Sequence, residues 1–285
     1  MPKRLFNLLA LPPLALAVSA CIGGGGDEIR SLPPVAAGPA PTYADFVTYG
    51  EAADLVAVVN IAEAVALKPE RAPNVSPGMV RFYVEGETQR LLYSQAPVGE
   101  VLTYLVDLPL DAEGKPPKIE KAPVIVFAKA GRVPGEIQLI APDAQLPATP
   151  TLIEQALAVM SQLSAADAPP RVSGVRDVLS VPGNLAGESE TQIFFASPDD
   201  ATVTATILRR PGQQPRWGVS WSEIVDQSAA APANGTLEWY RLACSLPESL
   251  PSGVLLTESA QDRARAESDY RVVRDGLGPC LRNRT

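Results

Sequence analysis

Short apolar runs separated by turn residues dominate the stretch from Tyr43 to about Ala166. Some runs alternate apolar and polar positions, as in a strand with one buried face. Others are apolar throughout, as in a strand buried on both faces. The runs lie at residues 55–59, 80–84, 101–108, 124–127 and 137–140. Clusters of Pro, Gly and Asp separate them, and such clusters mark turns. The pattern therefore predicts a sheet of five short strands.

Helical spacing replaces the strand pattern at the end of this stretch. Ile153, Leu157 and Met160 recur on one helical face. Thr151 and Glu154 fit a capping box, which predicts that the helix begins beside Thr151. Five short strands with a closing helix fit a small β-barrel of the oligonucleotide/oligosaccharide-binding type, or a sheet covered by that helix.

A second domain is predicted after Asp167-Ala168-Pro169-Pro170, so that residues 43–168 and 169–285 form two β-rich units. Further strand-like runs lie at residues 172–181, 191–196 and 203–208. The last run alternates apolar residues with threonines, which predicts a half-buried strand with a threonine outer face. We therefore expect an α+β, strand-rich chain whose second domain holds an antiparallel sheet.

One long helix is predicted from about Glu258 to Asp275. Ser259-x-x-Asp262 fits an N-terminal cap, and Gly276 fits a left-handed C-terminal cap. The inner face of this helix is predicted to consist of Ala266, Tyr270, Val273 and Leu277.

Cys244 and Cys280 flank that helix, and they are two of only three cysteines in the chain. We expect them to form a disulfide if the protein is exported to an oxidising compartment. A catalytic thiol or a metal pair is disfavoured, because the chain has no Cys-x-x-Cys motif and no histidine.

The first twenty residues are typical of a secretory signal peptide. Lys3 and Arg4 precede an apolar run over residues 5–18, and small residues follow it. A membrane-spanning helix needs about 20 apolar residues, and this run is shorter and is interrupted by Pro12-Pro13.

Val18-Ser19-Ala20-Cys21 resembles the lipobox, the motif that lipoprotein signal peptidase recognises. The resemblance covers only the start of the chain and says nothing about the mature domain. It implies cleavage before Cys21, attachment of lipid to the Cys21 thiol, and anchoring in a membrane by acyl chains. The same residues also fit an ordinary signal-peptidase site, which would release an unlipidated protein.

Residues 21–42 are predicted to form a flexible Gly/Pro tether. Four glycines follow Ile22, and residues 33–41 consist almost wholly of Pro, Ala and Gly. Position 22 is not aspartate, which by analogy with enterobacterial sorting favours the outer membrane, facing the periplasm.

Composition excludes several classes of function. The chain lacks histidine, which removes Ser-His-Asp and Cys-His catalysis and histidine-ligated metal sites. Cleavage before Cys21 would leave 22 basic and 32 acidic residues, a net charge of −10. Because such a surface repels phosphate backbones, nucleic acid is an unexpected partner. No cofactor motif and no metal motif is present in the sequence.

Two acid pairs and one tryptophan pair are the remaining candidates. Asp107 and Asp111, or Glu188 and Glu190, would act as a catalytic pair only if the fold held them face to face, and acids in surface turns are commoner. Trp217 and Trp221 share a face if they lie in a strand. That face is either core packing or an exposed binding surface.

These patterns together favour a membrane-anchored periplasmic lipoprotein. Its mature part is expected to be a non-enzymatic binding or structural module for a protein or polymer of the cell envelope. The alternative is a carboxylate-dependent hydrolase that acts on envelope polymers. A third hypothesis, a carrier for an apolar ligand, requires a cavity inside the barrel.

Overall fold

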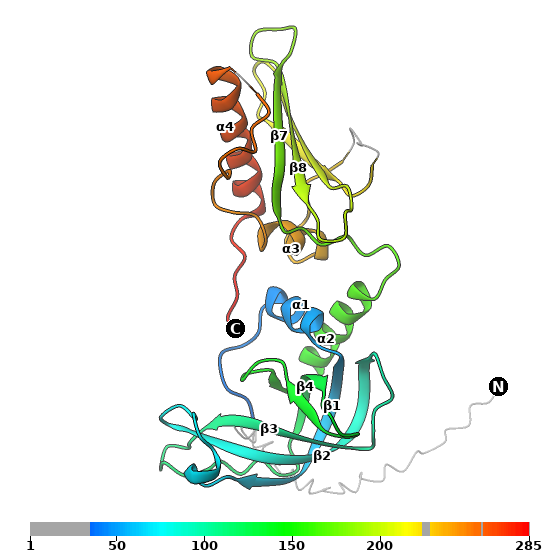
Figure 1. Ribbon diagram of the computed structural model, residues 1–285, viewed down its shortest axis with the longest axis vertical. Helices are drawn as coiled ribbons and strands as arrows, with labels where there is room; N and C mark the ends of the chain where they lie inside the picture. The colour runs from blue at the N-terminus through cyan, green and yellow to red at the C-terminus, as the bar shows by residue number, and fades with distance from the viewer. Residues whose placement is uncertain (1–34, 224–228, 258, 285) are drawn as a thin grey trace, which may run out of the picture. The chain divides into compact units, whose positions relative to one another are not determined.

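Two antiparallel sheets, each with its own helices, make up the part of the chain that the structure describes (Figure 1). The structure is a computed structural model, and it describes residues 35–223, 229–257 and 259–284. The signal peptide and residues 21–34 of the predicted tether lie outside these ranges. The α+β, strand-rich fold class and the two antiparallel sheets confirm the prediction.

The first sheet has the strand order β3-β2-β1-β4-β5, and β6 pairs with β4 off this path. Its strands are β1 (Leu55–Ala66), β2 (Met79–Ser94), β3 (Val101–Pro109), β4 (Pro123–Ala130), β5 (Ile137–Leu139) and β6 (Gln145–Pro147). Strands β1 and β4 pair centrally and pack against hydrophobic clusters on both sides: Val58 and Ile125 belong to one cluster, Val59 and Val124 to the other. Burial on both faces explains why residues 55–59 of β1 and 124–128 of β4 are apolar at every position.

Of the two arrangements expected for the first domain, the sheet is confirmed and the small barrel is wrong, because no closed barrel forms among the described strands. The one bridge between the two edges of the described sheet is an isolated parallel bridge from Thr103 of β3 to Glu136, the residue before β5. Strand β5 has only three residues, which is too short to build a ladder along the nine residues of β3. The sheet therefore stays open between β3 and β5.

The helices of the first part correct two expectations. Helix α1 (Tyr43–Ala52) lies where strands were expected, and Thr42 and Asp45 cap it reciprocally. Helix α2 (Pro150–Leu163) begins after Thr149, whose hydroxyl accepts a hydrogen bond from the Leu152 N–H at 3.3 Å, so the predicted cap at Thr151 is wrong. Pro150 favours this start because proline is well suited to the first turn. A short 3-10 helix, η1 (Pro69–Arg71), precedes β2.

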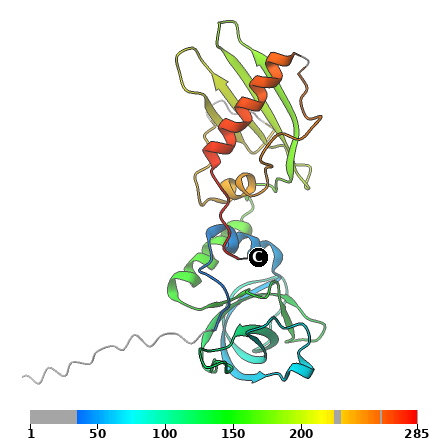
Figure 2. The same cartoon turned by 90° about the vertical axis from the view of Figure 1, so that its left-hand side faces the viewer.

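The second sheet has the order β10-β9-β8-β7, and one face of it is covered by the last helix of the chain (Figures 1 and 2). Its elements are β7 (Gly174–Pro182), β8 (Ser189–Ala196), β9 (Thr204–Arg209), β10 (Arg216–Ser220), α3 (Leu237–Ala243) and α4 (Ala260–Leu277). The four residues predicted for the inner face of α4 are all buried, which confirms that prediction.

The ends of α4 test the predicted caps separately. Ser259 caps the N-terminus by accepting a hydrogen bond from the Asp262 N–H at 3.0 Å, as expected. The C-terminal prediction is wrong: Gly278, at φ 68°, follows the helix, and Gly276 lies inside it. A Cβ at Gly276 would lie 2.8 Å from the Trp217 ring, so this glycine makes room for packing. Among the helices that the structure describes, none is long and apolar enough to cross a membrane.

Candidate functional site

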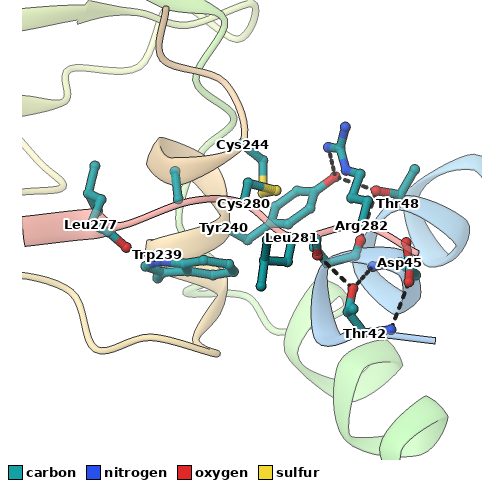
Figure 3. Close-up of a disulfide and its surroundings, with 12 residues drawn as sticks. Thr42, Asp45, Thr48, Trp239, Tyr240, Cys244, Leu277, Cys280, Leu281 and Arg282 are labelled. Carbon is teal, nitrogen blue, oxygen red and sulfur yellow. Dashed lines mark hydrogen bonds between the residues drawn. A yellow bond between two sulfur atoms is a disulfide. The ribbon is translucent and has the colours of Figure 1, made fainter. Parts of the chain in front are cut away.

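A disulfide fixes the point where the chain leaves α4 (Figure 3). Cys244 caps the C-terminus of α3, and it is bonded to Cys280 with the two Cα atoms 5.1 Å apart. This pairing confirms the prediction. The Trp239 Nε1–H beside it donates to the Leu277 carbonyl at 2.7 Å, which ties α3 to the last turn of α4. The disulfide and this hydrogen bond together fix the position from which the chain continues after α4.

Residues 281–284, here called the tail, run from this disulfide to the start of α1 (Figure 3). The Thr42 hydroxyl donates to the Leu281 carbonyl at 2.9 Å. The carboxylate of Asp45, which is 1% exposed, accepts the backbone N–H groups of Asn283 and Arg284, both at 3.1 Å. The tail thus supplies partners for a buried carboxylate near the N-terminus of α1.

The Arg284 side chain fastens the residues that precede α1. Its guanidinium donates to the carbonyls of Pro39 at 2.8 Å, Ala37 at 2.9 Å and Asp143 at 2.7 Å, and the side chain is 2% exposed. Residues 35–42 were expected to belong to the tether, but they are held against the folded chain. The prediction of a flexible tether therefore concerns only residues 21–34.

The second sheet has a groove on the face opposite α4. Thr191 and Arg209 bond to Asp269 of α4, so their side chains point toward that helix. Gln192 and Thr206, which are paired across β8 and β9, therefore point to the opposite face. Together with the hairpins at residues 183–188 and 210–215, this face surrounds a groove of about 830 Å³.

The floor of the groove presents amide and hydroxyl groups. Gln192 Nε2 donates to Glu190 Oε1 at 2.8 Å, and both side chains are half-buried. The hydroxyl oxygens of Thr206 and of its neighbour Thr204 are buried and have no hydrogen-bond partner in the described structure. An unsatisfied buried hydroxyl costs about 1–3 kcal/mol, so a bound water or ligand group that reaches Thr206 gains a hydrogen bond.

Side chains of both charges line the groove. Glu188 and Glu190 contribute carboxylates beside β8, whereas Arg210 and Arg216 contribute guanidinium groups beside β9 and β10. The segment 229–231 forms a further wall, and it passes so close to β10 that a Cβ at Gly218 would lie 1.9 Å from the Ala229 carbonyl oxygen. The groove therefore suits a polar ligand with both positive and negative groups.

The tryptophans have separate positions relative to this groove. Trp217 points toward α4, where its ring packs on Gly276, and it also lines the groove. Trp221 lies after the end of β10, and both side chains are half-buried and pack against the core. The groove floor is formed instead by Gln192 and Thr206, and the threonine alternation of β9 was the only sequence signal for it.

The two acid pairs also differ. Asp107 is held by Arg81 in a two-point ion pair, with both N–O distances 2.7 Å. Asp111 accepts the N–H groups of Glu113 at 3.0 Å and Lys115 at 2.8 Å, which makes it a turn residue. Glu188 and Glu190, in contrast, both line the groove.

The described residues contain no group of three or more Cys, Asp or Glu side chains that could hold a metal ion. The hydrophobic interior of the first sheet is filled by buried side chains. A scan against protein-family models and a search of curated proteins both found no match for the chain.

Proposed function

We propose that this protein is an exported lipoprotein, cleaved before Cys21 and held to the envelope by acyl chains on that cysteine. The Val18-Ser19-Ala20-Cys21 sequence carries the proposal. The Cys244–Cys280 bond supports it, because it leaves Cys21 as the one cysteine without an intramolecular partner. Residues 21–34 would then link the anchor to Val35, the first residue that the structure describes.

The mature part, in this proposal, is a binding module that holds an envelope protein or polymer in the groove of the second sheet. The single observation in its favour is the groove floor, where a buried and unpartnered Thr206 hydroxyl lies among amide and charged groups. Such convergent polar groups in a concave site are typical of a ligand site. The acidic net charge disfavours nucleic acid as the ligand.

Blocking the groove tests the binding proposal. The full chain is purified in detergent and used to capture crosslinked components from solubilised envelope. Gln192→Trp should fill the groove and abolish capture of the component that wild type retains. Leu256→Trp, at a position 56% exposed, is the matched control and should capture as wild type does. Identical capture by all three proteins would contradict the assignment of the groove.

A carboxylate-dependent hydrolase remains the second candidate, because Glu188 and Glu190 share the groove. Turnover by that mechanism requires an ionisable acid at both positions. Glu190→Gln should therefore abolish hydrolysis of an envelope polymer while it leaves binding largely intact. A binding module shows no product release with wild type or with this variant, as followed by chromatography of the polymer fragments.

A further inference from the structure

Three exposed apolar side chains lie side by side on the outer face of the first sheet. Val65 pairs with Tyr83 across β1 and β2, and Tyr83 pairs with Leu105 across β2 and β3. Val65 is 44% exposed, Tyr83 38% and Leu105 49%. We call these three residues the apolar row. Single exposed apolar residues are common on proteins, whereas a contiguous group indicates an interaction surface.

A hollow of about 880 Å³ extends from the apolar row toward the segment that follows β4. Tyr83 and Leu105 line one side of it, and Val133 and Pro134 line the other. Val133 is itself 60% exposed. The row and the hollow thus form one continuous surface, in which apolar side chains of β2, β3 and the segment after β4 lie together.

Carboxylates border this surface on one side. On the same face, the next cross-strand pair after Val65–Tyr83 is Glu63–Glu85, in which two like charges lie directly opposite each other. Glu87 follows on the same face of β2, and Glu136 lines the hollow. On the other side of the row, Arg81 and Asp107 neutralise each other as an ion pair. Directly opposed like charges destabilise a sheet, so a positive partner would relieve this repulsion.

We propose that the apolar row docks a segment of another envelope protein in which apolar side chains alternate with lysine or arginine. A second copy of this chain fits poorly, because its own Glu63–Glu85 pair would add carboxylates to the contact. An anionic bilayer fits poorly for the same reason. A basic segment gains both apolar burial and charge complementarity, and complementary charges set specificity. This surface is separate from the groove, so the inference does not depend on the ligand of the groove.

The test uses the full chain in detergent and fluorescence anisotropy with three synthetic peptides of equal length. One alternates leucine and lysine, the second leucine and glutamate, and the third serine and lysine, with detergent alone as the blank. The leucine/lysine peptide should bind at least tenfold more tightly than either of the others. Its binding should weaken at least tenfold in Leu105→Ser and in the double variant Glu63→Gln/Glu85→Gln.

Leu256→Ser is the matched control, because Leu256 is 56% exposed and lies outside both the first sheet and the groove. It should bind the peptide as wild type does, and Val65→Ser should not. The proposal is overturned if the leucine/lysine peptide fails to bind or binds all variants equally. It is also overturned if sedimentation shows a wild-type dimer that Leu105→Ser dissociates, because a second copy would then be the partner.

Discussion

The substitution Arg284→Ala tests whether the tail holds the residues before α1 against the folded chain. The guanidinium donates to three carbonyls at 2.7–2.9 Å and is shielded from solvent. A hydrogen bond to a charged group contributes about 1.5–3 kcal/mol. The two shortest bonds alone therefore give about 3 kcal/mol at the low end of that range. This loss is a large part of the about 5–15 kcal/mol that stabilises a typical domain.

Urea unfolding followed by tryptophan fluorescence measures this change. Arg284→Ala should lower the free energy of unfolding by about 3 kcal/mol and increase hydrogen exchange around residues 36–48. Arg282→Ala is the matched control: Arg282 stacks 5.8 Å from the Tyr240 ring centroid on the same tail. Its loss should cost about 0.5–1 kcal/mol. If the two variants were equally stable, the tail would not fasten the N-terminal segment.

Three further predictions concern other parts of the fold. Asp269→Ala, which removes a buried acceptor 2.6 Å from Arg209, should lower the free energy of unfolding by about 3 kcal/mol; a loss below about 1 kcal/mol in urea titrations would refute this. Glu85→Gln should raise stability by about 0.2–1 kcal/mol, because it removes repulsion with Glu63, and an unchanged or lower urea midpoint contradicts it. Burial raises the pKa of Tyr43 and Tyr270 to about 12. The contribution of these two phenols to the free energy of unfolding is therefore complete below about pH 10 and is lost as the pH rises toward about 12. A thermal unfolding midpoint that stays constant between these pH values would disprove this linkage.

The disulfide and Arg284 both hold the tail, so the losses in free energy of unfolding on removing each of them should not be additive. Opening the loop of 36 residues by replacing both cysteines with serine should cost about 3–4 kcal/mol in the chain-entropy model. Once the tail is released, Arg284→Ala has less left to remove, so the combined variant should lose less than the sum. Full additivity would show that the two links are independent.

Elements with a strong local period were predictable from the sequence. The five strand-like runs of the first sheet lie within β1 to β5 or extend one residue beyond β5, and the inner face of α4 is as expected. Helix α1 was not predicted, although Thr42 and Asp45 form a capping box. Its ten residues include apolar side chains and end just before the strand-like run that starts β1, so the sequence pattern does not separate the helix from the strand. That the sheet stays open could not be predicted, because it depends on β5 being too short to pair along β3.

The candidate sites were less predictable than the fold. The disulfide followed from cysteine positions alone, but the groove depends on which face of β8 and β9 is covered by α4. Asp269 of α4 makes that choice, because it bonds to Thr191 and to Arg209.

 The separations that matter are those from Asp269 to Thr191, 78 residues, and to Arg209, 60 residues. Contacts over such distances along the chain leave no local pattern, so the face that α4 covers could not be read from the sequence.

The apolar row also depends on contacts between segments that are distant in the sequence. Val65, Tyr83 and Leu105 come from three strands, and only the register between those strands places them side by side. A shift of one residue in either pairing would send one of them to the opposite face.

The intact mass of the native protein, purified from membranes in detergent, tests the central claim most directly. We predict a chain that begins at Cys21, carries the added mass of acyl chains on that residue, and is two hydrogens lighter than the reduced form because Cys244 and Cys280 are bonded. A chain that begins at Cys21 with an unmodified thiol, or that still carries Met1, would contradict the lipid anchor.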